Sequence, residues 1–462
     1  MSAPRPLALA ALCSCLSLAP LARADVPPPP PATPSTSPAA PGAITLEQAV
    51  TAALEKNHDQ INASLLSALA EQQEVVAKAA ILPVLGFNAS VGFSRAGGGE
   101  SIQLVNASGT ALNVEKPSST TGVYSFGLSV QQLIFDGGKW WNNLDAANAG
   151  FKSAQASLDE QKLQTRFLVE QKFYELLRAQ RQLLVLGEAS ARSRDQADFA
   201  QKLFDGGRAA QSDVYAARAN RDNDEVNRLG AEARVELARF DLSTTIGLDP
   251  SEPLAVVEPP QLLSDPAPPP AAKGAVEQAL TQRPSLKAAQ LTVEQGRKQM
   301  AASKGGYWPV VTANAGYNRN ALAIGDAVDP DLSKKNTLSG SINLNWNLFA
   351  GFSTDSGVRT QELQLVRAEN DYQNGRRGVA GDVERAVASL VSARAQARVS
   401  AQAEETAKQG LVLAKTRQQV GVGTQLEVRD AELKLTQAQL SHVNALLDGR
   451  EQESALRRAT GG

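Results

Sequence analysis

Residues 133–138 read Leu-Ile-Phe-Asp-Gly-Gly and residues 347–351 read Asn-Leu-Phe-Ala-Gly, so the same step from phenylalanine to glycine occurs twice, 214 positions apart. The same offset links pairs further along the chain: Gly207 with Gly421, Asp213-Val214 with Glu427-Val428, and Ala217 with Ala431. Phe135 to Gly207 spans 72 steps (207 − 135), as does Phe349 to Gly421 (421 − 349). Equal spacing over such a length predicts two long elements that lie side by side.

A second, larger offset relates the residues upstream of these stretches. It is 226 positions, and it links Ala53-Leu54 with Ala279-Leu280 and Pro83 with Pro309. The first copy therefore holds 12 more residues (226 − 214) between its proline and its phenylalanine, which predicts a longer loop there. We predict one pseudo-symmetric architecture, with these parts: a first repeat over 44–248, a Pro-rich connector over 249–273 and a second repeat over 274–462.

The N-terminus has the features of a secretory signal peptide. Arg5 precedes an apolar stretch from Leu7 to Leu21, and Ala22-Arg23-Ala24 fits a small-residue cleavage site. A charged residue, an apolar run and small residues in this order are typical of a signal for export. We therefore predict that residues 1–24 are removed from the mature protein.

The segment around this cleavage site bears on cysteine chemistry. Cys13 and Cys15 are the two cysteines of the chain, and cleavage after residue 24 removes both. Lipidation of Cys15 is the alternative. Residues 25–43 are rich in Pro, Ala, Ser and Thr, a composition that favours an extended spacer. No later segment reaches the ~18 to 20 apolar residues of a membrane helix, so any membrane crossing must use strands.

Four segments alternate between apolar and small polar residues, as strands with two different faces do. They are 85–94, 123–134, 311–318 and 338–349. The polar positions are Asn, Ser, Gly, Thr and Gln without a charge, which suits the wet lumen of a membrane barrel better than the outer surface of a soluble sandwich. Pro83, Gly137, Pro309 and Gly351 mark the switches between helix and strand, and the predicted external loops are Arg95–Thr121 and Arg319–Asn336.

Aromatic residues lie near these switches. Trp140-Trp141 and Tyr307-Trp308 are placed as the aromatic residues at a membrane interface are. Ordinary packing at a domain boundary is the alternative for these two pairs. The distinction matters because only the first reading needs a lipid bilayer around the strands.

Helical patterns occupy most of the remaining chain. We expect a bent helix over 44–80 with its bend at Asn57-His58, and a counterpart over 275–303 with its bend at Arg283-Pro284. Longer helices follow Gly137 and Gly351 and run to about Leu203 and Arg417. At 1.5 Å per residue they reach about 100 Å, and their seams are filled with Ala, Gln and Ser. A packed cylinder of helices fits this pattern, and a free coiled-coil dimer is the alternative.

Short glycine-containing turns end the long helices. They are Phe204–Gly207 and Val420–Gly423, and second helices run from them to about Gly247 and Arg458. Asp213 and Glu427 lie in the first turns of these second helices, where the positive end of the helix dipole favours carboxylates.

In this order, the motifs resemble those of the TolC-like outer membrane efflux protein family, over the chain from Ile44 to about Leu456. The matching stretches are Leu46-Glu47 with Leu54 and Asn57-His58, Ala279-Leu280 with Arg283-Pro284, Pro83, Pro309, the strand exits at 133–138 and 347–351, and the Gly-x5-Asp/Glu-Val-x-x-Ala turns. The resemblance implies a mixed α and β membrane protein. In it, three chains each give four transmembrane strands to one barrel and long helices to a coiled-coil periplasmic tunnel.

The resemblance also implies partners and a gate. The tunnel tip meets a periplasmic adaptor protein and an inner-membrane pump, with Gly206, Gly207, Gly421 and Gly423 in the turns that contact the adaptor. A closed resting tip carries an acidic ring, which falls on Glu427 and Asp430 here; ordinary N-terminal helix acids are the alternative for these two residues.

The family's residues that hold neighbouring tip helices together are matched only in part by this sequence. Ser212 and Asp213 match the first-repeat partners of the latch. Some family members also use an Arg and a Tyr before the second acidic pair, where this chain has Gly423 and Gln418. Arg208, on the first-repeat turn, is a candidate substitute.

These patterns favour a passive conduit, an outer-membrane exit duct for small amphiphiles, metals or polypeptides that a separate pump drives. We predict no enzyme activity, cofactor or metal site, because His58 and His442 are far apart in the repeat and no catalytic cluster occurs. A net charge of −2 without a basic stripe argues against nucleic acid as a partner. A barrel-anchored tether without an open pore and a soluble helical repeat protein are the alternatives.

Overall fold

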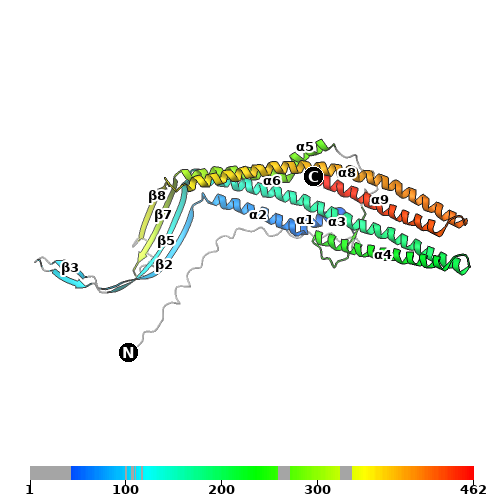
Figure 1. Ribbon diagram of the computed structural model, residues 1–462. Helices are drawn as coiled ribbons and strands as arrows, with labels where there is room; N and C mark the ends of the chain where they lie inside the picture. The colour runs from blue at the N-terminus through cyan, green and yellow to red at the C-terminus, as the bar shows by residue number, and fades with distance from the viewer. Residues whose placement is uncertain are drawn as a thin grey trace, which may run out of the picture. The chain divides into compact units, whose positions relative to one another are not determined.

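A computed structural model describes residues 43–98, 101–105, 109, 111–115, 118–258, 271–322 and 336–462. The chain has two compact units, Met1–Ala43 and Ile44–Gly462, and the account below concerns the second. The predicted signal peptide lies outside the described residues, as do most of the N-terminal spacer and the middle of the connector. Within residues 44–462, Figure 1 shows the strands at one end of the helices and the two helix–helix turns at the other.

The bent helices begin and end within three residues of their predicted boundaries in both repeats. α1 (Leu46–Lys56) and α2 (His58–Ala79) meet at Asn57, and α5 (Ala272–Gln282) and α6 (Pro284–Lys304) meet at Arg283. The side chain of Asn57 accepts hydrogen bonds from the backbone N–H groups of two residues in the first turn of α2, and Pro284 is the first residue of α6. Both are favoured ways to begin a helix, so the predicted bends are confirmed.

The long helices repeat with the sequence offset of 214. α3 (Lys139–Asp205) and α8 (Ser353–Gln419) have 67 residues each, and α4 (Gln211–Ile246) and α9 (Gln425–Thr460) have 36 each. α3 and α4 pack together as the first hairpin, and α8 and α9 as the second hairpin. Among the described residues, no helix combines the length and the apolar content that a bilayer-crossing helix requires.

Four antiparallel strands form one sheet in the order β2 (Val84–Ala96), β5 (Ser119–Phe135), β7 (Val310–Ala321) and β8 (Asn336–Asn345). The register places the predicted apolar residues of neighbouring strands opposite one another, as in the pairs Phe87–Leu128, Leu128–Tyr317 and Tyr317–Leu338. We call their side the apolar face. The polar face carries, among others, Asn88, Ser90, Ser125, Gly127, Ser129, Asn314, Asn318, Ser339, Ser341 and Asn343.

The polar face is held by small residues that fit together across strands. The hydroxyls of Ser90 and Ser125 are 2.6 Å apart and share a hydrogen bond. A Cβ atom added to Gly127 would overlap the Oδ1 atom of Asn318 and lie 3.1 Å from that of Asn88. Glycine at this position therefore leaves room for both asparagine side chains over β5, and none of the described residues on this face is charged.

Several predicted boundaries in the strand region are wrong. The expected loop Arg95–Thr121 instead contains the ends of β2 and β5 and a further hairpin, β3 (Ser101–Val105) with β4 (Ala111–Glu115). The expected loop Arg319–Asn336 begins and ends inside strands, because Arg319 belongs to β7, opposite Phe126, and Asn336 begins β8. At this end, both strands thus extend beyond the residues that show the alternating pattern.

The helix-proximal ends of the strands also differ from the prediction. β8 stops at Asn345, so the expected strand end at residues 346–349 is irregular. In β5, a register shift between Leu133 and Phe135 leaves Ile134 without a partner in β7, whereas the alternation placed it on the apolar face. Such a bulge bends the strand before the turn into α3.

Two apolar clusters obey the same repeat. The first-repeat cluster includes Val169, Phe173 and Leu176 of α3, and the second includes Val383, Val387 and Leu390 of α8, each 214 positions later. Ala49 and Ala53 of α1 join the first cluster, as Ala275 and Ala279 of α5 join the second. The duplicated sequence therefore builds two equivalent cores.

Two short strands, β1 (Ala43–Ile44) and β6 (Ala255–Val256), form a separate sheet, and the 3₁₀ turn η2 (Gly305–Tyr307) follows α6.

Candidate functional site at the helical tips

Both tip turns reverse the chain with a glycine in the left-handed conformation. Gly207 has φ +70° and Gly421 has φ +83°. The backbone N–H of Arg208 donates to the carbonyl of Leu203 at 2.7 Å, and that of Val422 donates to Arg417 at 3.0 Å. These bonds satisfy carbonyls that the helix end leaves open. The two turns thus have equivalent backbone bonds around the shared glycine.

A close approach of the backbone accounts for glycine at position 423 in the second turn. A Cβ atom there would lie 2.9 Å from the backbone nitrogen of Gln418 and 3.0 Å from two atoms of Arg417. Its N–H donates to the Arg417 carbonyl at 2.9 Å. Close backbone approach therefore favours glycine at this position.

The predicted acidic residues are exposed at the start of α9. Thr424 caps this helix by accepting a hydrogen bond from the backbone N–H of Glu427 at 3.2 Å. The Glu427 carboxylate lies 3.6 Å from Arg417, at the end of α8, and Asp430 forms an ion pair with Lys434 at 2.6 Å. Both carboxylates keep about half of their side-chain area exposed. They can meet other subunits or ions, and their role as an acidic ring stays a prediction.

The predicted latch candidates are on the first tip turn and the start of α4. Asp213 accepts a hydrogen bond from the backbone N–H of Ala210 at 3.2 Å, which makes it a cap of its own helix. Ser212 and Arg208 are exposed, and Arg208 forms no ion pair with any other described residue. The exposed Ser212 and Arg208 side chains can therefore meet a neighbouring subunit, whereas Asp213 is engaged in its own helix, and no hydrogen bond or ion pair from these three joins the two hairpins among the described residues.

The ion pair that does connect the hairpins near the tip was not predicted. Arg429 of α9 binds Asp224 of α4 with two hydrogen bonds, Nη1 to Oδ2 at 2.7 Å and Nη2 to Oδ1 at 3.1 Å. The side chains are only 15% and 10% exposed. Asp224 follows Ala217 by seven residues and precedes Ala231 by seven, so it occupies a buried seam position. A charged residue in a seam of alanines was the sequence signal that could have identified it.

A second buried acid, Glu432, lies about one helical turn after Arg429 in α9. Glu432 is almost wholly buried and contacts Lys415 of α8 at 3.6 Å. Burial raises the pKa of its carboxyl above the ordinary value, although Lys415, Arg192 and Arg429 oppose this effect. Arg192 of α3 donates to the hydroxyl of Thr436 at 3.1 Å. The contact region between the hairpins is therefore polar and charged near the tip.

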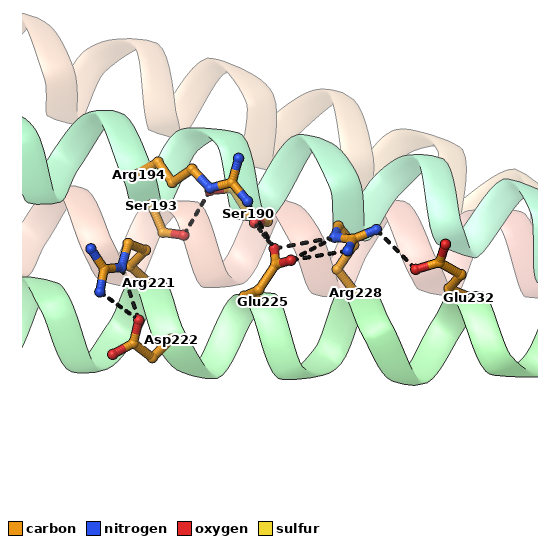
Figure 2. Close-up of polar contacts among 8 residues, drawn as sticks. All are labelled: Ser190, Ser193, Arg194, Arg221, Asp222, Glu225, Arg228 and Glu232. Atoms are coloured by element: carbon orange, nitrogen blue, oxygen red, sulfur yellow. Dashed lines mark hydrogen bonds and ion pairs between the residues drawn. The ribbon is translucent and has the colours of Figure 1, made fainter.

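The first hairpin has a polar network between its own two helices, drawn in Figure 2. Glu225 of α4 accepts hydrogen bonds from Ser190 and Arg194 of α3, at 2.8 and 3.2 Å, and from Arg228 on its own helix. The bonds from Arg228 and then Ser190 lower the pKa of Glu225 to about 2. Glu225 thus stays ionised at neutral pH and joins α3 to α4.

At the other end of the helices, the predicted switch residues lie where helix meets strand. Pro83 directly precedes β2 and Pro309 directly precedes β7. Gly137 has φ +71°, and a Cβ atom there would lie 2.7 Å from both the Gly305 carbonyl and the Trp308 side chain. Gly351 has φ +58° with nothing within 4 Å of such an atom. The two equivalent switches therefore differ in how tightly they are packed.

Most of the aromatic residues near these switches are exposed, whereas Trp140 is half-buried against Trp141. Trp141, Trp308 and Trp346 keep more than half of their surface accessible, and the indole N–H of Trp346 donates to the Tyr307 carbonyl at 3.1 Å. Exposed tryptophans with one satisfied polar atom suit a membrane interface. Among the described residues, no three His, Cys, Asp or Glu side chains gather as metal ligands.

Comparisons with known proteins agree with this architecture. The profile of the family described as outer membrane efflux protein matches residues 49–248 and 275–462. The chain is 26% identical over 338 residues to outer membrane protein TolC of Vibrio cholerae, covering 73% of this chain and 76% of TolC. It is 24% identical over 343 residues to outer membrane efflux protein BepC of Brucella suis, covering 74% and 72% of the two chains.

A solved structure has the same fold. CusC, whose crystal structures were described with transmembrane channel formation, superimposes with a TM-score of 0.76 at 17% identity, over 90% of this chain and 92% of that one. The predicted fold class, with strands for a transmembrane barrel and long helices for a periplasmic tunnel, is thus confirmed, and the protein is located in the outer membrane. With a family profile matched over most of its length, the chain belongs to the outer membrane efflux protein family.

Proposed function

We propose that this outer-membrane efflux protein works as the gated, trimeric exit duct of a tripartite efflux or secretion system. In this proposal a periplasmic adaptor and an inner-membrane pump deliver cargo to the helical tips, and the cargo leaves passively through the strand end. The observation that carries the proposal is the uncharged polar face of the sheet. Small polar residues on one face and mostly apolar residues on the other, apart from Arg95 and Arg319 near the strand ends, match a water-filled lumen inside a lipid-facing wall.

The edges of the sheet support the trimer. Within the described residues, β2 and β8 each pair on one side only. Open strand edges in a bilayer leave backbone N–H and C=O groups without partners, so only a closed barrel is stable there. Pairing of β8 in one chain with β2 in the next closes the sheet, and three copies supply enough strands for an aqueous lumen.

The acidic residues at the helical tip support the proposal of a gate. Threefold symmetry about the tunnel axis brings three copies of Glu427 and Asp430 together, one helical turn apart on the same face of α9. Rings of carboxylates favour cations and bind multivalent cations strongly. Arg417 and Lys434 reduce this negative charge within each chain, so the net effect is set by the exposed carboxylate oxygens.

A double substitution of the tip acids tests this proposal. We expect Glu427→Ala with Asp430→Ala to reduce cation selectivity in planar bilayers, and to weaken block by multivalent cations added on the side of the helical tips. Glu405→Ala with Glu362→Ala, which removes two acids from α8 instead, is the matched control and should change neither property. Unchanged selectivity and block in the tip variant would refute the acidic ring. A trimer that inserts but never conducts would favour a tether without a pore.

A further inference from the structure

All four tryptophans of the chain lie where the strands meet the helices. Trp140 and Trp141 are in the first turn of α3, and Trp308 and Trp346 lie beside the ends of β7 and β8 (Figure 1). The strands cross the outer membrane and the helices are periplasmic, so this junction lies at the periplasmic surface of the bilayer. Tryptophans are enriched at such a surface.

Two segments of the junction are packed closely together. One is the start of α3, where Lys139 is the first helical residue. The other is the end of α6, where Lys304 directly precedes Gly305 of η2. A Cβ atom added to Gly305 would lie only 3.1 Å from the Cβ atom of Lys139. Two lysines that are 165 positions apart (304 − 139) are therefore neighbours at the membrane surface.

These two lysines are exposed, and neither has a carboxylate within ion-pair distance among the described residues. Two nearby acids have other partners. Asp136 is buried and accepts a hydrogen bond from the backbone N–H of Trp140 at 2.9 Å. Asp355 accepts one from the hydroxyl of Tyr307 at 2.7 Å. The exposed charge at the start of α3 and the end of α6 is therefore positive.

The repeat provides a comparison for Lys304. Its counterpart at the offset of 226 is Lys78, which forms an ion pair with Glu74 at 2.7 Å. The position of Glu74 is taken in the second repeat by Met300. Lys304 therefore lacks the acid, one helical turn earlier, that neutralises its counterpart.

The start of α3 also differs from its counterpart. Residues Ser353–Asp355 of α8 occupy the places of Lys139–Trp141, so both the lysine and the two indole rings are confined to the first repeat. A lysine at the first position of a helix is opposed by the positive end of the helix dipole. Its charge therefore does not serve the helix itself, which favours a role toward an external anion.

Unpaired ammonium groups beside indole rings at a membrane surface suit a lipid headgroup. The phosphate lies at this depth, and the rings can contact the adjoining acyl chains. Two positive charges favour a headgroup with net negative charge over a zwitterionic one. We propose that Lys139 and Lys304 bind the phosphate of an anionic phospholipid in the inner leaflet of the outer membrane, at one site in each chain. The site depends on the membrane location and does not depend on conduction.

The tryptophans make this site directly measurable, because the chain has none elsewhere. The full-length trimer is reconstituted into phosphatidylcholine vesicles that contain a small fraction of phosphatidylglycerol with brominated acyl chains. Bromine quenches indole fluorescence only at short range, so quenching reports this lipid at the junction. Brominated phosphatidylcholine at the same fraction is the reference. We expect a preference for the anionic lipid on the order of 25-fold, from about fivefold for each lysine.

Variants test whether the two lysines cause the preference. Lys139→Gln with Lys304→Gln should reduce quenching by the anionic lipid to the level of the reference. Lys139→Arg with Lys304→Arg should retain the preference, because the charges remain, and this pair of substitutions guards against an effect of folding. Lys78→Gln is the matched control. It removes a lysine from the equivalent helix end, but one that already pairs with Glu74, and should leave the preference unchanged.

Three results would overturn the proposal. One is equal quenching of the native trimer by the two brominated lipids. Another is a preference that survives the double glutamine substitution. The third is an equal loss of preference in Lys78→Gln, because any lysine near the bilayer surface would then suffice.

Discussion

Single glycines decide where this chain passes from strand to helix, and the two repeats use them differently. Gly137 and Gly351 both have positive φ, but only Gly137 is pressed against another part of the backbone, at Gly305. At the next position the first repeat has Gly138 with φ +79° and the second has Phe352 with φ +64°. Phe352 packs edge-to-face against Phe349 with ring centroids 5.6 Å apart, which offsets the cost of this conformation for a residue with a side chain.

This difference predicts unequal effects of alanine at the two switches. Gly351→Ala should lower the free energy of unfolding by about 1 kcal/mol, the cost of left-handed backbone for alanine. Gly137→Ala should cost roughly 2–4 kcal/mol, because overpacking against Gly305 and Trp308 is added. Denaturant unfolding of the detergent-solubilised variants, followed by circular dichroism, measures both. Equal losses would show that the close approach at Gly137 is not part of the folded state.

Glu225 predicts an acid-dependent loss of stability. Its folded pKa of about 2 is below the ordinary value of 4.5, so its contribution is fully present above pH 4.5 and is lost as the pH falls toward 2. Glu225→Gln should therefore be less stable than the native chain at neutral pH, with a difference that shrinks below pH 4.5. Thermal unfolding at a series of pH values is the measurement. A difference that stays constant down to pH 2 would contradict the ion-pair network of Figure 2.

The raised pKa of Glu432 predicts the opposite pH dependence of stability. Burial raises its folded pKa, so the stability linked to its protonated form is present below the ordinary pKa and lost as the pH rises through the raised value. Glu432→Gln should be at least as stable as the native chain at neutral pH, and the advantage should disappear in acid. The same pH series measures this, and a variant that is less stable at pH 7 would show that Lys415, Arg192 and Arg429 outweigh the desolvation.

At the scale of elements, periodicity predicted the helices well because their pattern extends over many turns. Both ends of α3, α4, α8 and α9 repeat at 214 positions, as the sequence suggested. The strands were predicted less well. β2 and β5 continue beyond their alternating pattern, since pairing with a neighbour is enough to hold residues whose side chains are not patterned.

Only part of the candidate site at the tips could be predicted, because local sequence does not show which distant residues come into contact. Glu427 and Asp430 stand out by their place after a turn, which local sequence reveals. The partnership of Asp224 with Arg429 depends on contact between residues 205 positions apart. Local pattern marks Asp224 as unusual in its seam but cannot supply its partner, because only the packing of two hairpins brings Arg429 to it.

The apolar cluster of the first repeat predicts where the helices are most sensitive. Phe173 is fully buried among α1, α3 and α4. Phe173→Ala should cost about 3–5 kcal/mol through lost transfer energy and the cavity left behind. Phe199→Ala, on the same helix but 41% exposed, is the control and should change stability far less. Similar losses for both would contradict the position of the core.

At the scale of the whole molecule, one chain leaves apolar surface that its own elements do not cover. Leu65, Leu66 and Leu69 of α2 are each more than half exposed, as are Leu338, Ile342 and Leu344 of β8. The apolar face of the sheet suits lipid, whereas α2 lies beside the periplasmic helices, where exposed leucines favour contact with another subunit. Leu65→Gln with Leu69→Gln should lower the temperature at which trimers dissociate in detergent, and an unchanged temperature would exclude α2 from the subunit contact.

The most direct measurement of the central claim is the single-channel conductance of the purified, trimeric protein in a planar bilayer. The account predicts small, cation-selective steps that multivalent cations block from the side of the helical tips, because the acids lie at that end and the lumen is lined by uncharged polar residues. Steps without cation selectivity would contradict the acidic gate. Silence from trimers shown to be inserted, persisting after Glu427→Ala with Asp430→Ala, would contradict the exit duct itself.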